Sequence, residues 1–80
     1  MKISYTRRFL KDLNKAKSAD LLPKIKDLIE IISKNYLATY PPFEKLTDKN
    51  YSRRINVQHR LVYAVTKDTV IFLRCWGHYE

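Results

Sequence analysis

The pattern of apolar residues in this sequence changes at a short proline-containing segment, YPPFEKL, at residues 40–46. In residues 7–36, upstream of it, apolar residues recur every three or four positions, which is typical of amphipathic helices. Downstream, apolar and polar residues alternate, which is typical of half-buried strands. A residue that precedes proline is pushed into an extended conformation, so residues 40–46 are predicted to form a loop that enters a short strand. The chain should therefore place its helices first and most of its strands afterwards.

Two helices are predicted in the first half of the chain. Thr6 is suited to cap a helix over residues 7–17. Its apolar face contains Phe9, Leu10, Leu13 and Ala16, and its polar residues Arg8, Lys11, Asp12 and Lys15 are expected elsewhere on the helix. Ser18 or Asp20 is expected to cap a second helix, whose apolar stripe extends from Leu21 to Tyr36. The short link between them predicts an antiparallel helical hairpin.

Four stretches of alternating or β-branched residues are predicted to be strands. They are KISY at residues 2–5, YSRRINV at residues 51–57, HRLVYAVT at residues 59–66 and TVIFLRCWGHY at residues 69–79. Lys67-Asp68 is predicted to form the hairpin turn between the last two. Helices grouped before strands are typical of an α+β fold, so we expect a β-α-α-β-β-β order, with a possible further strand at residues 40–46. Two helices should pack on one face of a curved, mainly antiparallel sheet.

The net charge limits the kinds of partner. The 80 residues contain 16 Lys and Arg against 8 Asp and Glu, which gives a formal charge of +8. Such an excess in a small folded domain fits a polyanionic partner, either nucleic acid or an acidic protein. A chain of this length is expected to form a single domain over residues 1–80.

Cysteine content and hydropathy exclude several classes of protein. A single cysteine, Cys75, excludes an internal disulfide and a cysteine-rich zinc site, and it is predicted to be a buried apolar residue of the last strand. The first residues do not resemble a signal peptide, and no apolar run is long enough to cross a membrane. We therefore expect a cytoplasmic protein that uses no metal and no cofactor.

Several arginines lie within the predicted strands. They are Arg53, Arg54, Arg60 and Arg74. In an antiparallel sheet, arginines of adjacent strands can converge on one concave surface, where guanidinium groups bind phosphate in a bidentate manner. The alternative is that they are solvated residues that pair with nearby carboxylates, such as those of Glu44, Asp48 and Asp68.

A carboxylate and an imidazole beside several arginines suit the cleavage of RNA by its own 2′-hydroxyl. A general base removes the hydroxyl proton, a general acid protonates the departing 5′-oxygen, and cations stabilise the transition state. Glu44, His59 and His78 are the candidates for acid and base, and Tyr79 and Trp76 are aromatic residues on which a base could stack. Spacing alone makes this a weak signal, and His59 is interpreted as structural.

Four short segments resemble the YoeB (Txe) branch of the RelE-like toxin family. They are PFEKL, YSRRI, HRLVYAV and the final HY pair, and the likeness is densest over residues 41–79. The resemblance implies a toxin of a type II toxin–antitoxin system, which is a ribosome-dependent endoribonuclease that cuts mRNA in the ribosomal A site. It also implies a cognate acidic antitoxin, expected to be YefM- or Axe-like, and a homodimer in many members.

The resemblance assigns roles to individual residues. Glu44 matches the general base and Arg60 the phosphate-stabilising arginine, while His78 matches the general acid and Tyr79 the tyrosine next to it. Arg54 matches a second substrate-contacting arginine, and we expect Arg53, Lys45 and Lys49 to bind RNA as well. The family has a lysine where this chain has Thr47, so whether Lys45 or Lys49 replaces it is open, as is the effect of the additional carboxylate of Glu80.

Two alternatives to a nuclease remain. One is a basic RNA- or ribosome-binding module without catalysis. The other is an inactive member of the toxin family that only interacts with its partner. The first of these predicts that Glu44 and His78 are dispensable.

Overall fold

A computed structural model describes residues 1–77 of the 80. The elements are β1 (Lys2–Tyr5), α1 (Arg7–Ser18), α2 (Leu22–Lys34), β2 (Phe43–Lys45), β3 (Asn50–Arg54), β4 (Arg60–Val65) and β5 (Thr69–Arg74). The five strands form one mixed sheet in the order β1-β5-β4-β3-β2, in which β1 runs parallel to β5 and the other pairs are antiparallel. The predicted α+β fold is therefore confirmed.

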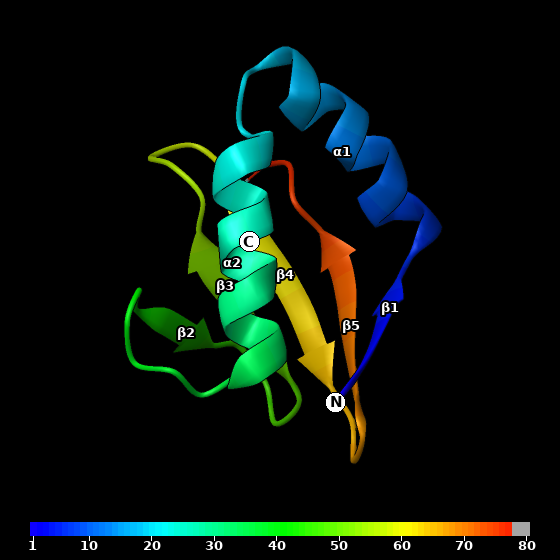
Figure 1. Ribbon diagram of the computed structural model, residues 1–80, viewed down its shortest axis with the longest axis vertical. Helices are drawn as coiled ribbons and strands as arrows, with labels where there is room; N and C mark the ends of the chain where they lie inside the picture. The colour runs from blue at the N-terminus through cyan, green and yellow to red at the C-terminus, as the bar shows by residue number, and fades with distance from the viewer. Residues whose placement is uncertain (78–80) are drawn as a thin grey trace.

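The two helices pack on one face of the sheet, as expected (Figure 1). Their fully buried residues are Phe9, Ala16, Ile25, Leu28 and Ile32. From the sheet, the core receives Tyr51, Leu61, Tyr63, Val65, Val70 and Phe72. The rings of Phe9 and Phe72 lie 5.7 Å apart, and that of Tyr5 lies 5.4 Å from Phe9, so an aromatic cluster joins α1 to β1 and β5.

The start of α1 is as predicted, but that of α2 is not. Thr6 caps α1, because its hydroxyl accepts a hydrogen bond of 3.0 Å from the Phe9 N–H. The expected cap of α2 by Ser18 or Asp20 is wrong, since Leu21 occupies the cap position and makes no side-chain cap hydrogen bond. Asp20 has a φ of 60° and belongs to the turn that closes α1, where its N–H donates to the Lys17 carbonyl.

Asp12 is buried, although the helical pattern placed it away from the apolar face. Its carboxylate accepts a hydrogen bond of 3.2 Å from the Cys75 N–H and lies 3.6 Å from the Arg8 guanidinium. A buried carboxylate is tolerated when it is paired in this way. Asp12 therefore connects α1 to the segment that follows β5.

Two strands end earlier than predicted. β3 ends at Arg54, because the Asn56 side chain accepts hydrogen bonds from the Gln58 and His59 N–H groups and turns the chain at once. β5 ends at Arg74, so Cys75, although buried as expected, lies just beyond it. The turn between β4 and β5 lies at residues 66–68, in agreement with the predicted turn at residues 67–68. Within residues 1–77, no helix has both the length and the apolar character to cross a membrane.

Candidate active site

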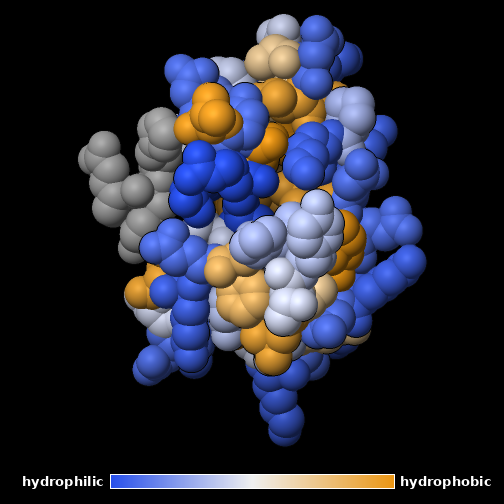
Figure 2. Space-filling model, turned by 90° about the vertical axis from the view of Figure 1, so that its left-hand side faces the viewer, coloured by the Kyte–Doolittle hydropathy of each residue, from blue (hydrophilic) through white to orange (hydrophobic). Residues whose placement is uncertain are grey.

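The face of the sheet that the helices leave uncovered carries a cluster of polar side chains. Strand register places Glu44 of β2 opposite Ser52 of β3, and Arg54 of β3 opposite Arg60 of β4. Side chains directly opposite each other, and those two residues apart along a strand, share one face of a sheet. We call Glu44, Ser52, Arg54 and Arg60 the open-face cluster. Figure 2, viewed from the side where β2 and β3 lie, shows strongly hydrophilic side chains beside apolar ones.

Arg60 is at the centre of the open-face cluster. Its Nη1 donates a hydrogen bond of 3.1 Å to the Ser52 hydroxyl and lies 3.5 Å from Oε2 of Glu44. The Arg60 side chain is 22% exposed and that of Glu44 62%. The guanidinium is thus fixed by the sheet, while the carboxylate reaches it from the edge strand and remains accessible.

A hollow of about 330 Å³ lies over this cluster. It is lined by Pro41, Pro42, Phe43, Glu44, Arg54 and Arg60. Two guanidinium groups face one carboxylate there, and like charges directly opposite in a sheet repel each other. An anion bound between Arg54 and Arg60 would relieve that repulsion and accept charge-assisted hydrogen bonds from both. The hollow is therefore suited to bind a phosphate group.

Arg53 is fully buried on the opposite face of β3, so its predicted role in RNA binding is wrong. Its guanidinium donates to the carbonyls of Tyr36, Ala38 and Pro41 and to the Tyr63 hydroxyl, at distances of 2.5 to 3.0 Å. It also lies 5.1 Å from the centre of the Phe43 ring. Arg53 thus anchors the segment that leads into Glu44. Burial raises the pKa of the Tyr63 hydroxyl, although its hydrogen bond with Arg53 lowers that pKa in part.

The two lysines proposed to replace the family lysine do not lie in the cluster. Lys45 pairs with Tyr51 in the sheet, which places it on the face opposite to Glu44. The Lys49 carbonyl accepts a hydrogen bond from the Val65 N–H, so Lys49 lies at the end of β4 remote from Arg60. The Thr47 hydroxyl accepts a hydrogen bond from the Asn50 N–H in the same turn.

His78, Tyr79 and Glu80 lie outside the described residues, and the last described residue is Gly77. Gly77 has a φ of 95° and lies beside the cluster, because its carbonyl accepts a hydrogen bond of 3.1 Å from the Arg60 N–H. Its own N–H donates to Nδ1 of His59 at 2.9 Å. The His59 ring stacks on Trp76, with ring centres 3.8 Å apart, which agrees with the structural interpretation of His59.

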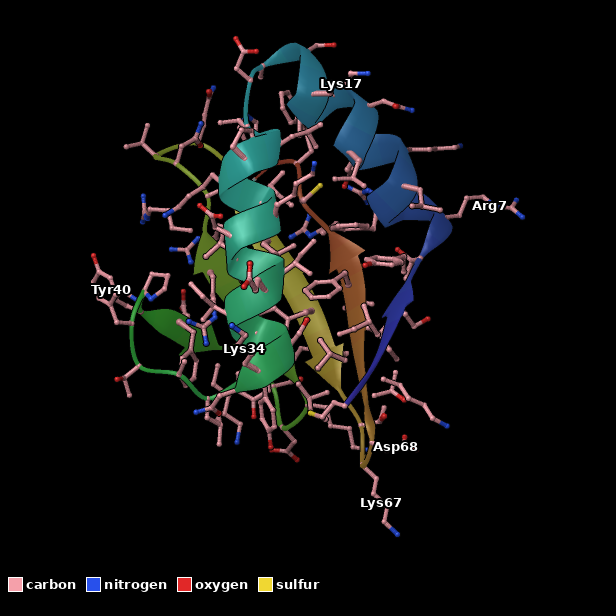
Figure 3. The ribbon with its side chains drawn as sticks, in the orientation of Figure 1. Arg7, Lys17, Lys34, Tyr40, Lys67 and Asp68 are labelled. Carbon is pink, nitrogen blue, oxygen red and sulfur yellow. The ribbon has the colours of Figure 1, made fainter. Side chains whose placement is uncertain are left out.

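Two residues at this site were not among the predicted ones. Ser52 is buried and contacts Arg60, and its position opposite Glu44 depends on a strand register that the sequence does not reveal. Tyr40 is 83% exposed and precedes the prolines that line the hollow. Figure 3 shows its side chain projecting away from the sheet. The position of Tyr40 before two prolines, in a predicted loop, was the sequence signal for its exposure.

The remaining reactive groups offer no second site among residues 1–77. Burial raises the pKa of the Cys75 thiol to about 12, with a further contribution from the nearby Asp12 carboxylate, so the thiol is a poor nucleophile at neutral pH. In this part of the chain, no group of three or more His, Cys, Asp and Glu side chains is arranged to hold a metal ion.

Sequence comparison identifies relatives of this chain. A family described as "YoeB-like toxin of bacterial type II toxin-antitoxin system" matches residues 5–79. Toxin YoeB of Escherichia coli (strain K12) is 55% identical over 29 residues, which are 36% of this chain and 34% of that protein. That alignment thus covers about a third of the curated relative.

Solved structures match over nearly the whole chain. The YoeB/ParE toxin from Agrobacterium tumefaciens has a TM-score of 0.87 and 29% identity, with coverage of 99% of this chain and 100% of that one. YoeB from Staphylococcus aureus matches as a dimer, with a TM-score of 0.84 and 32% identity, and in a YoeB–YefM complex, with 0.80 and 30%. Both cover 99% of this chain and 98% of the other. The chain belongs to the YoeB-like toxins of bacterial type II toxin–antitoxin systems.

Proposed function

We propose that this toxin is an endoribonuclease that cuts mRNA in the A site of the ribosome, in the cytoplasm. The observation that carries the proposal is the contact of 3.5 Å between Glu44 and Arg60 on the open face, with Arg54 directly opposite Arg60. A base and two phosphate-binding groups are thereby held by three adjacent strands. Family membership supports the same reading.

In the proposed reaction, the substrate supplies its own nucleophile. The Glu44 carboxylate takes the proton from the ribose 2′-hydroxyl, and the 2′-oxygen attacks the adjacent phosphorus. Arg60 and Arg54 stabilise the additional negative charge on the phosphorane. The bond to the 5′-oxygen breaks, and this oxygen takes a proton from His78. Tyr79 contacts the substrate beside it, and the products carry a 2′,3′-cyclic phosphate and a 5′-hydroxyl.

Phosphate binding and base catalysis are coupled through Arg60 in this scheme. Without substrate, the Arg60 guanidinium contacts Glu44. A phosphate bound to Arg60 competes for the same N–H groups, which frees the carboxylate to accept the 2′-hydroxyl proton. Because the Glu44 side chain is exposed at the sheet edge, it can move away from Arg60 without disturbing the core.

The helices are proposed to contact ribosomal RNA. The exposed helical lysines proposed for this contact are Lys11, Lys15, Lys17, Lys24 and Lys26. Figure 3 shows Arg7 and Lys17 pointing away from the sheet, so these cations are too remote to contact the mRNA at the open-face cluster. Binding that neutralises phosphates releases counterions, so affinity for the ribosome should fall steeply with salt.

The proposed inhibitor is an acidic, YefM-like antitoxin, as in the solved complex of the S. aureus relative. Its carboxylates would occupy the phosphate positions beside Arg54 and Arg60 and keep mRNA out of the hollow. Assembly into a dimer, as in the other S. aureus structure, is part of the proposal.

The decisive experiment compares variants on mRNA in translating ribosomes. Glu44→Gln and His78→Gln should each lower the cleavage rate by roughly 10²- to 10⁴-fold, because each removes a proton-transfer group. Glu30→Gln is the matched control, since Glu30 is an exposed helical glutamate that pairs with Lys34. An mRNA with a 2′-deoxy nucleotide at the cut should bind and stay intact. Wild-type rates for both active-site variants would contradict the assigned base and acid, whereas absence of cleavage by the wild-type protein would favour an interaction-only protein.

A further inference from the structure

Gly77 is held by two neighbouring residues of one short segment. Its N–H donates to Nδ1 of His59, and its carbonyl accepts from the N–H of Arg60, at 2.9 and 3.1 Å. Both polar groups of its backbone are therefore paired beyond the end of β5. We call this pair of hydrogen bonds the Gly77 clamp.

His59 is also held by contacts other than its hydrogen bond with Gly77. Its ring stacks on Trp76 at 3.8 Å with an angle of 21° between the planes. The backbone N–H of His59 donates to Oδ1 of Asn56 at 2.7 Å, and the backbone carbonyl of His59 accepts from the Ile55 N–H at 2.9 Å. His59 is also buried. An imidazole nitrogen that accepts a hydrogen bond carries no proton, so the clamp requires the neutral ring with its proton on Nε2.

The Gly77 clamp holds the chain beyond the end of β5. β5 pairs with its neighbours only as far as Arg74, so no sheet hydrogen bond directs Gly77. Glycine has the widest choice of backbone conformations, and Gly77 adopts a φ of 95°. Without the clamp, Gly77 could adopt other backbone conformations. With it, Gly77 is held in one conformation beside Arg60.

We propose that His59 is a positioning residue, whose Nδ1 fixes Gly77 and thereby the direction in which the chain approaches His78. The consequence for catalysis rests on the proposed function, because it assumes that His78 is the general acid. The clamp itself does not depend on that assumption. If His59 served only to pack on Trp76, its ring would be sufficient and its Nδ1 acceptor would not be required.

Substitutions at position 59 separate the acceptor from the ring. His59→Asn places an amide oxygen near the position of Nδ1, whereas His59→Gln places it one methylene further out, near Nε2. The two variants carry the same amide group and differ only in its distance from the backbone. His59→Phe keeps an aromatic ring against Trp76 and has no acceptor. If it fails to fold, the Asn and Gln pair still decides the question.

Gly77 can be observed alone, because it is the single glycine of the chain. Labelling the full chain with ¹⁵N-glycine should give one backbone amide signal, whose hydrogen exchange reports on the Gly77 N–H. We expect similar exchange in wild type and His59→Asn, and exchange roughly two- to tenfold faster in His59→Gln and His59→Phe, as for the loss of one hydrogen bond. Equal exchange in all four proteins would overturn the clamp.

Cleavage kinetics then test the positioning role. His59→Gln and His59→Phe should lower kcat with little change in KM, and His59→Asn should recover most of kcat. If the glutamine variant loses the Gly77 protection and retains full kcat, the clamp exists but does not position the acid, and this inference is wrong. If wild type cleaves no mRNA, the proposed function fails, while the exchange measurement still decides the clamp.

Discussion

The two faces of the sheet use the same side chain for opposite purposes, as Arg53 and Arg54 show. Arg53 points towards the helices and is fully buried, with its guanidinium bound to carbonyls and a hydroxyl. Arg54 is exposed on the open face, directly opposite Arg60. The first arginine satisfies backbone groups of a loop, and the second lines the hollow that is proposed to bind phosphate. Surroundings, and not residue type, decide which arginine can act on a substrate.

The largest effect is expected on the covered face. Arg53→Met should lower the free energy of unfolding by about 2–4 kcal/mol, because it leaves buried acceptors without a donor. Urea unfolding measures this loss. Arg53→Lys tests whether one positive charge can replace the guanidinium. It should recover only part of the lost free energy of unfolding, since an ammonium cannot reproduce the planar fork of donors. If Arg53→Met lowers the free energy of unfolding by less than about 0.5 kcal/mol, the buried arginine does not stabilise the fold and the two faces do not differ in this respect.

A smaller effect should appear in alkali, again on the covered face. Burial raises the pKa of the Cys75 thiol to about 12 from its ordinary value of 9.0. Above pH 9 the unfolded chain releases the thiol proton while the folded chain retains it, so stability is lost as the pH rises towards 12. Unfolding free energies measured from pH 8 to 11 should therefore fall more steeply in wild type than in Cys75→Ala. Parallel curves would show that the thiol is accessible to water.

The smallest effect on stability is expected at Arg54. Arg54→Met should change the free energy of unfolding by no more than about 0.5 kcal/mol, with a slight gain because the repulsion of Arg60 is removed. The same variant should bind RNA more weakly and with a shallower dependence on salt. Denaturant unfolding and RNA titrations at several salt concentrations check both statements. Strong destabilisation would mean that Arg54 supports the fold as Arg53 does.

Periodicity predicted the order of the elements, because helices and strands each bury one face. The same alternation could have predicted that Arg53 is buried, because Arg53 lies on the same face of the strand as Tyr51 and Ile55, which are both buried. Strand ends were less predictable, since β3 stops where the Asn56 side chain captures two backbone N–H groups. The alternation of apolar and polar residues does not predict such a hydrogen bond between a side chain and the backbone.

The candidate site could be predicted only in part. Glu44, Arg54 and Arg60 were named from the sequence, and the structure brings them together on one face. Ser52 and the positions of Lys45 and Lys49 depend on strand register, which is set by pairing between distant segments. The roles of His78 and Tyr79 stay predictions, because these residues lie outside the described part of the chain.

The position of β5 in the sheet affects when the toxin can fold during its own synthesis. β5 consists of residues 69–74, yet it lies between β1, from the start of the chain, and β4. Contacts between segments so distant in sequence form late and slow folding. While residues 69–74 remain inside the ribosome, β1 has no partner strand and the sheet cannot close. The toxin therefore completes its fold only after residues 69–74 have left the ribosome that made it.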